Sequence, residues 1–351
     1  MSAPLRTLVL GLGGMGRSHL DAYRRDPGFE VVGLCNRSEV ALGDEWTKTP
    51  FFTDFEAALA ETQPELVSVN TWSDSHAPYA IRAMEAGAHV FVEKPLATTV
   101  EDAQRVVDTA TRLGRKLVVG YILRHHPSWL EFIRLAREFG GPYVMRMNLN
   151  QQSSGATWQA HKNLMRSLSP IVDCGVHYVD VMCQVCDAKP VQVRGMGARL
   201  TDEVAPEMYN YGHLQVLFED GSAGWYEAAW GPMISETAFF VKDIMTPKGC
   251  VSIVMAEGAK SDDMETHTRT ATIRVHDAAL GNDGSFLNED RLISMADEPG
   301  HQALCDREQA FVAQAIREDV DLSRHMADAV RSLEIVLAAD RSIREMRAVE
   351  L

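Results

Sequence analysis

Apolar and polar residues alternate in blocks along the first third of the chain. Five short, β-rich apolar runs alternate with longer stretches in which apolar residues recur at helical spacing. Strands that alternate with helices in this way predict an α/β fold with a parallel, doubly wound sheet, which binds ligands at the carboxyl ends of its strands. The predicted strands are Arg6–Leu10, Phe29–Cys35, Leu66–Asn70, His89–Val92 and Lys116–Tyr121. The predicted helices are Met15–Arg25, Glu39–Thr47, Asp54–Ala60, His76–Ala86 and Val100–Leu113.

The periodicity changes after Pro142, where seven β-rich runs are separated by short turns. These runs, with a hairpin-turn sequence at residues 219–222, predict an open, mostly antiparallel sheet. Two long helical stretches, Pro299–Glu318 and Arg324–Arg347, follow. We therefore expect two domains, residues 1–123 and an α+β domain of residues 124–351, since domains usually have about 100 to 200 residues. The predicted strands of the second domain are Tyr143–Gln152, Val191–Arg199, Tyr209–Glu219, Ala223–Trp230, Ala238–Asp243, Cys250–Met255 and Arg269–His276.

A glycine-rich turn joins the first predicted strand to the first predicted helix. Gly11, Gly13 and Gly16 have the G-x-G-x-x-G spacing, and Gly14 and Met15 complete the turn. In this motif the first glycine makes a tight turn, the second lets the backbone approach a pyrophosphate, and the third lets the helix pack closely on the strand. The phosphates bind free N–H groups at the start of the helix. Because a second β-rich run follows at the right distance, the motif predicts that the first domain is a dinucleotide-binding Rossmann domain.

The residue expected to contact the ribose is uncharged. Asn36 lies 20 positions after Gly16, where NAD-specific domains usually have a carboxylate. Arg37 and Ser38 follow and offer the cation and the hydroxyl that a 2′-phosphate needs, so we expect NADP or NAD as cofactor and favour NADP. The alternative is that Arg37 is an exposed loop residue. Further cofactor contacts are expected near the ends of the third and fourth strands, from Thr71, Trp72, His76, Glu93 and Lys94.

Two polar features have the chemistry of a catalytic site. Lys94 ends a predicted strand, where an ammonium can polarise a substrate hydroxyl or carbonyl, although lysines in general lie on surface loops. A helix predicted from Ser169 is mostly apolar except for one stripe of polar residues. A carboxylate and an imidazole one turn apart in such a helix are either a general acid–base pair or an internally satisfied core pair. The residues of the stripe are Asp173, His177, Asp180 and Gln184.

The overall composition narrows the function classes. With 46% hydrophobic and 24% charged residues, no secretory leader and no apolar run of about eighteen residues, the sequence indicates a cytoplasmic globular protein. A formal net charge of −15 without clusters of Lys and Arg argues against nucleic acid or a membrane as partner. The lone pair Cys183 and Cys186 is more typical of small buried residues than of a metal or redox site, so we expect no metal.

Several motifs together resemble the glucose-fructose oxidoreductase, inositol dehydrogenase and rhizopine-catabolism (Gfo/Idh/MocA) superfamily. The resemblance implies a Rossmann domain followed by a domain whose open sheet usually makes oligomer contacts, and hence a homodimer or homotetramer. It also implies NAD(P)-dependent oxidation or reduction of a sugar, sugar derivative or cyclitol. The motifs are the glycine turn, Glu93-Lys94-Pro95, Gly120-Tyr121 with Arg124 and Pro127, Asp173-x-x-x-His177, the hairpin at 218–221 and Lys248-Gly249.

The resemblance assigns roles to single residues. Lys94, Asp173 and His177 match the catalytic positions, which implies that His177 exchanges the substrate's hydroxyl proton while Asp173 orients it. The chain departs from the family pattern at Trp72, and at other positions near the expected substrate pocket, so the particular sugar stays open. A cofactor-assisted glycosidase or lyase and a non-enzymatic sugar sensor are the alternatives. Further substrate contacts are expected from Tyr121, Arg124, Trp158, His161 and Lys162.

Overall fold

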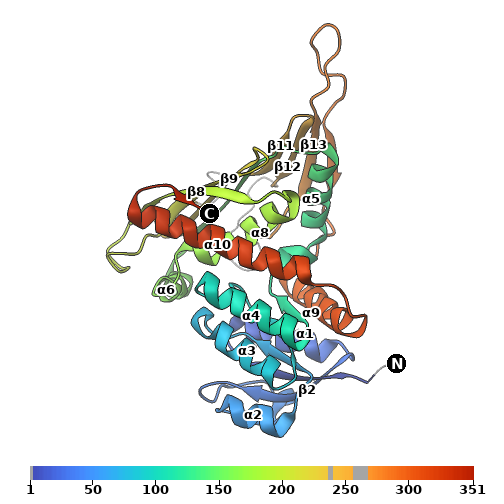
Figure 1. The fold of residues 1–351 in the computed structure, drawn as a ribbon, viewed down its shortest axis with the longest axis vertical. Coiled ribbons are helices and arrows are strands. Elements are labelled where there is room, and N and C mark those ends of the chain that lie inside the picture. The colour runs from blue at the N-terminus through green and yellow to red at the C-terminus, as the bar shows by residue number, and fades with distance from the viewer. Residues whose placement is uncertain (1–2, 236–239, 256–267) are drawn as a thin grey trace. The chain divides into compact units, whose positions relative to one another are not determined.

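The computed structural model describes residues 3–235, 240–255 and 268–351, which form two compact units (Figure 1). Unit 1 runs to Ile122 and includes Gln302–Leu333, whereas unit 2 contains Leu123–His301 and Glu334–Leu351. The first change of unit lies next to the expected boundary at residue 123. The assignment of Gln302–Leu333 differs from the expectation, because the apolar residues of this segment complete the buried core of the first unit.

Unit 1 contains the expected doubly wound sheet, in the strand order β3-β2-β1-β4-β5-β6. All neighbouring strands are parallel, and the central strand β4 is buried along its whole length, as parallel strands covered on both faces are. The parallel sheet predicted from the sequence is therefore confirmed. Its strands are β1 (Leu5–Leu10), β2 (Phe29–Cys35), β3 (Phe51–Phe52), β4 (Leu66–Val69), β5 (His89–Val92) and β6 (Leu117–Val119).

The helices of unit 1 agree with the sequence pattern except at one place. Residues 39–47, predicted as a helix, contain only the 3-10 turn Asp44–Trp46. The partly buried Val40 and Leu42 pack against the core there, and Arg17 donates a hydrogen bond to the Ala41 carbonyl, so tertiary contacts override a weak helical pattern. The helices are α1 (Gly14–Arg25), α2 (Phe55–Thr62), α3 (His76–Glu85), α4 (Val100–Leu113), α9 (His301–Arg317) and the first part of α10 (Ser323–Glu345). His301, the first residue of α9, is assigned to unit 2.

Unit 2 is built on a nine-stranded sheet in the order β14-β13-β12-β11-β7-β10-β9-β8-β15. One central pair, β7 with β10, is parallel and the other neighbours are antiparallel, so the expected open, mostly antiparallel sheet is confirmed. The prediction for 238–243 lies partly outside the described residues. The strands are β7 (Val144–Gln152), β8 (Pro190–Ala198), β9 (Tyr211–Phe218), β10 (Ala223–Gly231), β11 (Lys242–Thr246), β12 (Gly249–Val254), β13 (Thr272–Asp277), β14 (Arg291–Ser294) and β15 (Val349–Glu350).

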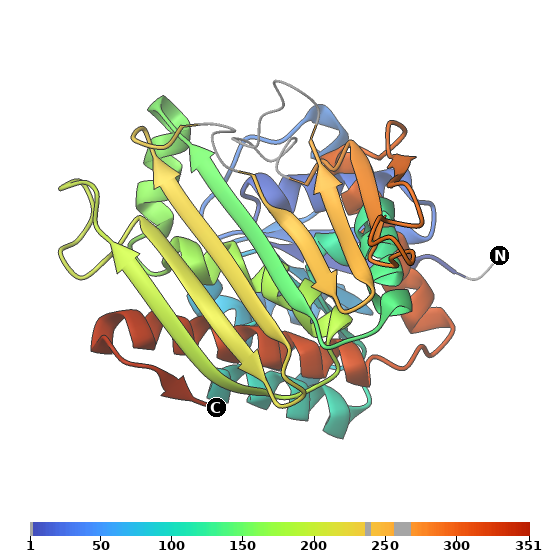
Figure 2. The ribbon, with the colours of Figure 1, turned by 90° about the horizontal axis from the view of Figure 1, so that it is seen from above.

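Helices of unit 2 cover one face of this sheet, and Figure 2 shows the opposite face towards the viewer. The helix predicted from Ser169 is two helices, because the hydrogen-bond pattern is interrupted at Cys174. Cys174 keeps right-handed helical dihedral angles, with φ −86° and ψ −34°. Two further helices, α5 and α6, were not predicted from the sequence. The helices are α5 (Pro127–Phe139), α6 (Gly155–Leu164), α7 (Pro170–Asp173) and α8 (Gly175–Val185), with the end of α10.

Within the described part of the chain, no helix is both long and apolar enough to span a membrane.

Candidate active site

The glycine turn of unit 1 has the form that a dinucleotide needs. Gly11 has a φ of +86°, and a Cβ there would lie 2.5 Å from the Asn70 carbonyl oxygen. A Cβ on Gly16 would lie 1.9 Å from the carbonyl oxygen of Gly11, so helix and turn are in close contact. Gly13 and Gly14 are exposed, and a Cβ on either would meet no described atom within 4 Å. The turn therefore leaves open space at the start of α1 for a pyrophosphate, and its residues fit the group.

The loop after β2 is fastened to the glycine turn by Asn36. Its side-chain oxygen accepts a hydrogen bond from Leu12 N (3.2 Å), and its amide nitrogen donates to the Ser38 carbonyl (2.8 Å). Arg37 and Ser38 are exposed. The amide thus shapes the loop, and the cation and hydroxyl next to it are accessible.

The remaining predicted cofactor residues follow β4 and β5, at the same edge of the parallel sheet. Trp72 is 53% exposed, whereas His76 is buried. The His76 ring lies between two carbonyl groups, with Nδ1 2.7 Å from Pro95 O and Nε2 2.9 Å from Thr71 O. His76 therefore links the two loops, and its contribution to a cofactor site would be to hold them together.

Lys94 directly follows the buried Glu93, whose carboxylate accepts a hydrogen bond from the Lys94 backbone N–H. Burial by itself raises the pKa of Glu93, but the hydrogen bond from His19 and the positive charge of Lys94 outweigh it, and the pKa lies below its usual value. Glu93 is therefore ionised at neutral pH. The Lys94 side chain is half-buried and so has access to solvent.

In unit 2, Asp173 and His177 lie on either side of the junction between α7 and α8. Ser169 caps α7 by accepting a hydrogen bond from Val172 N, and Pro170 begins the helix. Every residue from Leu168 to Cys183 is buried except His177, which is half-buried. This segment therefore presents one imidazole to solvent and keeps the Asp173 carboxylate inside.

The other end of the polar stripe has a structural partner. Arg124 forms a bidentate ion pair with Asp180, with Nε–Oδ2 at 2.8 Å and Nη2–Oδ1 at 2.6 Å. Gln184 donates a third hydrogen bond to the same carboxylate. Because Asp180 is fully buried, this pairing locks α8 to the start of the unit, and a substrate contact by Arg124 stays a prediction.

Several predicted substrate contacts are engaged by side chains of their own unit. Tyr121 is fully buried, and its hydroxyl lies 2.9 Å from Ser332 Oγ. Trp158 and Lys162 both donate to the carboxylate of Glu203, at 3.1 and 2.6 Å. These geometries favour packing roles for all three residues.

His161 lies in a cluster that the sequence did not indicate. Its ring stacks on Trp230 with centroids 4.4 Å apart, and Nδ1 lies 3.0 Å from Ser153 Oγ. Burial lowers the pKa of His161 to about 4 although the charge of Asp173 opposes this, so the ring is neutral at physiological pH. Trp230 Nε1 donates to Gln151, its register partner across the parallel β7–β10 pair. Gln151 and Trp230 are far apart in the sequence, so only the strand pairing shows that they lie in the same cluster as His161.

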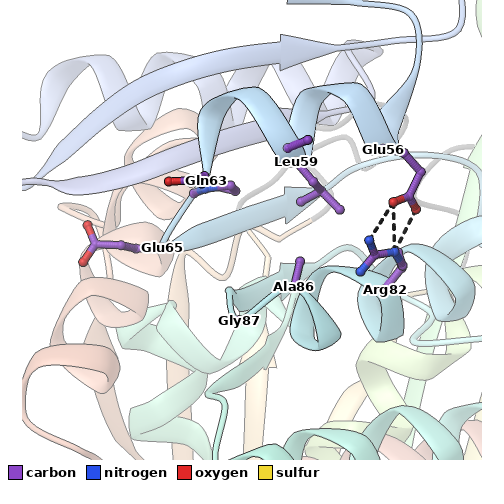
Figure 3. Close-up of a pocket in the computed structure, with 9 residues that line it drawn as sticks. Glu56, Leu59, Gln63, Glu65, Arg82, Ala86 and Gly87 are labelled. Atoms are coloured by element: carbon purple, nitrogen blue, oxygen red, sulfur yellow. Dashed lines mark hydrogen bonds and ion pairs between the residues drawn. The ribbon is translucent and has the colours of Figure 1, made fainter.

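A surface hollow in unit 1 does not coincide with these residues (Figure 3). It lies between α2, α3 and the turns that precede β4 and β5, so it is at the amino ends of the strands. Arg82 is directed at Glu56 across it, in a bidentate ion pair. Ligands of doubly wound sheets bind at the opposite, carboxyl edge, where Lys94 lies. The described residues contain no group of three potential metal ligands.

The fold is a Rossmann domain followed by a domain with an open, mostly antiparallel sheet. Residues 5–121 match the family model described as an oxidoreductase family with an NAD-binding Rossmann fold, and residues 134–237 match the GFO/IDH/MocA C-terminal domain. The chain belongs to the Gfo/Idh/MocA family.

Relatives of known activity are distant. The chain is 28% identical to the D-glucoside 3-dehydrogenase of Escherichia coli over 52% of its own length, and spans only 54% of that protein. It matches about half the length of several inositol 2-dehydrogenases as well. The scyllo-inositol 2-dehydrogenase (NAD(+)) of Bacillus subtilis is 26% identical over 100% of the chain and 97% of that protein.

Solved structures share the fold. GenD2 from gentamicin A biosynthesis, in complex with NAD, superposes with a TM-score of 0.76 at 22% identity, and the match covers 100% of this chain and 97% of GenD2. The aldose-aldose oxidoreductase of Caulobacter crescentus, complexed with glycerol, gives a TM-score of 0.77 at 21% identity, covering 99% and 100% of the two chains.

Proposed function

We propose that the protein transfers a hydride between a nicotinamide cofactor and a carbon that bears a hydroxyl group in a sugar, sugar derivative or cyclitol. The observation that carries the proposal is that His177 alone is half-buried in an otherwise buried segment, with the Asp173 carboxylate one turn before it. An isolated core histidine would be buried with its neighbours. The relatives that act on glucosides and inositols support this substrate class.

Each residue has one role in the proposed reaction. The cofactor, when bound, accepts or donates the hydride. His177 takes the hydroxyl proton during oxidation and returns it during reduction, and Asp173 orients the imidazole. Lys94 hydrogen-bonds the reacting oxygen and stabilises the negative charge that develops on it.

The same proposal extends to the whole chain. Residues 1–123 bind the cofactor at the glycine turn, with NADP preferred because Arg37 and Ser38 are accessible and no carboxylate stands at position 36. Residues 124–351 bind the substrate and form a homodimer or homotetramer through the open sheet. We place the protein in the cytoplasm, acting on a small molecule rather than on nucleic acid or a membrane.

The test is a pair of substitutions measured with the best substrate from a panel of sugars, cyclitols and glycosides. Turnover is followed by the absorbance of reduced nicotinamide, and aglycone release is followed in parallel. We expect His177→Ala and Lys94→Ala each to lower kcat by about 10²- to 10⁴-fold, the usual contribution of general acid–base catalysis. Cofactor affinity should stay nearly unchanged in His177→Ala.

Gln184→Ala is the control, because it removes a hydrogen bond from the same helix without touching the proposed chemistry. It should lower the thermal midpoint and leave kcat per folded molecule unchanged. A His177→Ala protein that is destabilised yet fully active would show that His177 is a structural residue. Aglycone release without net reduction of the cofactor would instead establish the glycosidase alternative.

A further inference from the structure

A continuous chain of buried hydrogen bonds ends at the Lys94 backbone. The Tyr23 hydroxyl donates to Oε1 of Gln309 (2.8 Å), and the Gln309 amide donates to Nδ1 of His19 (2.9 Å). Nε2 of His19 lies 2.7 Å from Oε1 of Glu93, whose other oxygen accepts from Lys94 N (3.2 Å). All of these residues belong to unit 1. The side chains from Tyr23 to Glu93 are buried, with residue exposures between 0 and 7%.

The pattern of donors defines the proton positions along this chain. An ionised Glu93 can only accept, so Nε2 of His19 carries the hydrogen. Nδ1 is then the acceptor for the Gln309 amide, and the Tyr23 hydroxyl selects the orientation of that amide by donating to its oxygen. The network therefore directs Nε2–H of His19 at the Glu93 carboxylate and Nδ1 at the Gln309 side chain.

His19 also determines the charge of its neighbour. Burial raises the pKa of Glu93, and the His19 hydrogen bond is the first of the effects that lower it below its usual value. The Lys94 ammonium is among the charges that act on Glu93, and the same attraction acts in the other direction. Loss of the His19 hydrogen bond would therefore remove a negative charge from the surroundings of Lys94.

The packing around the pair is adapted to it. Phe91 contacts the His19 ring edge-on, with centroids 4.6 Å apart. Gly120 lies against the Glu93 carboxylate, and a Cβ there would come within 3.3 Å of it. His19 stands on α1, the helix that begins at the glycine turn, so one rigid element joins the cofactor end of the unit to the Lys94 segment.

We propose that His19, Glu93 and Gln309 are positioning residues for Lys94, which hold its backbone in place and keep an ionised carboxylate at the preceding position of the chain. This inference rests on the proposed function, since it gives Lys94 the catalytic role.

The first experiment needs no substrate and no cofactor. The full chain is labelled with trace acetic anhydride between about pH 7 and 11, and mass spectrometry of the Lys94 peptide gives the titration midpoint of that amine. Because each variant removes the neighbouring charge, we expect His19→Phe and Glu93→Gln to lower the midpoint by about one pH unit. The double variant should show no further shift, since both substitutions act through one carboxylate.

Matched variants separate positioning from general packing. Gln309→Leu should shift the Lys94 midpoint in the same direction, because it leaves His19 Nδ1 without its donor. Gln302→Leu is the control: Gln302 lies on the same helix and donates to the Ser18 carbonyl of α1 (2.8 Å), but does not touch His19. His19→Gln retains an N–H donor for Glu93 and should restore the midpoint.

The second experiment measures turnover with the substrate found by the panel. His19→Phe should lower kcat at least about tenfold, and the double variant with Lys94→Ala should be no slower than Lys94→Ala alone, because effects that act through one residue are not additive. The proposal is overturned if the Lys94 midpoint in His19→Phe equals that of the unmodified chain at equal folded fraction. It is also overturned if Gln302→Leu shifts the Lys94 midpoint as much as His19→Phe does. If His19→Phe does not fold, Gln309→Leu decides by the same criterion. An unchanged kcat in Lys94→Ala refutes the proposed function and leaves the labelling result standing.

Discussion

Burial affects the ionisable side chains of this protein in different ways, depending on the partner that each one has. Glu93 stays ionised because His19 donates to it, whereas the stacked ring of His161 stays neutral. Lys242 shows the consequence of burial for a cation. It is 2% exposed, and its ammonium lies 3.8 Å from the Phe240 ring centroid and 5.5 Å from that of Tyr178. Desolvation lowers the pKa of Lys242 to about 7.

The Lys242 pKa predicts a pH dependence of stability. The pKa of Lys242 is lower in the folded chain than the usual value of about 10.4 in the unfolded chain, so between about pH 7 and 10 the unfolded state binds more protons. The free energy of unfolding should therefore rise with pH in this window, by up to about 5 kcal/mol. Lys242→Met should abolish this increase in the free energy of unfolding. Urea unfolding of both proteins at several pH values measures the increase.

Lys248→Met is the matched control, because Lys248 lies in the turn after the same strand and is exposed. It should retain the rise. If Lys242→Met keeps the full pH dependence, Lys242 is charged in the folded state throughout, and its contact with the two rings outweighs desolvation.

At the scale of elements, the loop after β2 decides the proposed cofactor preference. Asn36 and Arg17 fix this loop, through bonds to Leu12 and Ala41, so Arg37 projects from a braced segment rather than from a free one. A braced loop loses little further conformational freedom when it binds a ligand.

We expect NADP(H) to bind more tightly than NAD(H), and Arg37→Ala to narrow the difference by lowering the affinity for NADP(H) alone. NAD(H) has no 2′-phosphate, so Arg37 can form this ion pair only with NADP(H), which accounts for the selectivity. Calorimetric titration of both cofactors measures it, with Lys48→Ala, an exposed residue of the same connection, as control. Tighter binding of NAD(H), unaffected by Arg37→Ala, would show that the loop does not recognise the phosphate.

At the scale of the whole molecule, the sheet of unit 2 has a face without helices among the described residues (Figure 2). Val144 and Leu217 are 43% and 47% exposed and are joined in register through Ala223, so they lie on this face together. Met196, 61% exposed, lies further along the same face on β8, in register with His213. Apolar side chains gathered on one sheet face are usually covered by a partner.

Sedimentation at micromolar concentration should therefore give a dimer or tetramer, because covering these side chains with a second copy removes them from water. Leu217→Glu should shift the equilibrium towards the monomer. Leu287→Glu, a substitution at a 64% exposed position in the loop before β14, should not. A monomer at all concentrations would contradict the assembly through this face.

The sequence alone determined the layout of unit 1 and the glycine turn, because periodicity and turn chemistry act over short distances. The central helices α3 and α4 and the strands β2 and β5 begin and end within one residue of their predicted positions. In the same way Gly11 and Gly16 have the geometry that their spacing predicts, since only glycine fits two contacts this close.

Tertiary structure decided the features that depend on residues far apart in the chain. The helix expected at 39–47 gave way to contacts with the core, and α9 joined unit 1 because its apolar residues complete that core. The sequence placed Asp180 in the same stripe as His177, and only the fold shows that Arg124 binds it. His19 and Gln309 are 290 positions apart, so no local pattern links them to Lys94. Their hydrogen bond exists only because packing brings α9 and α1 together.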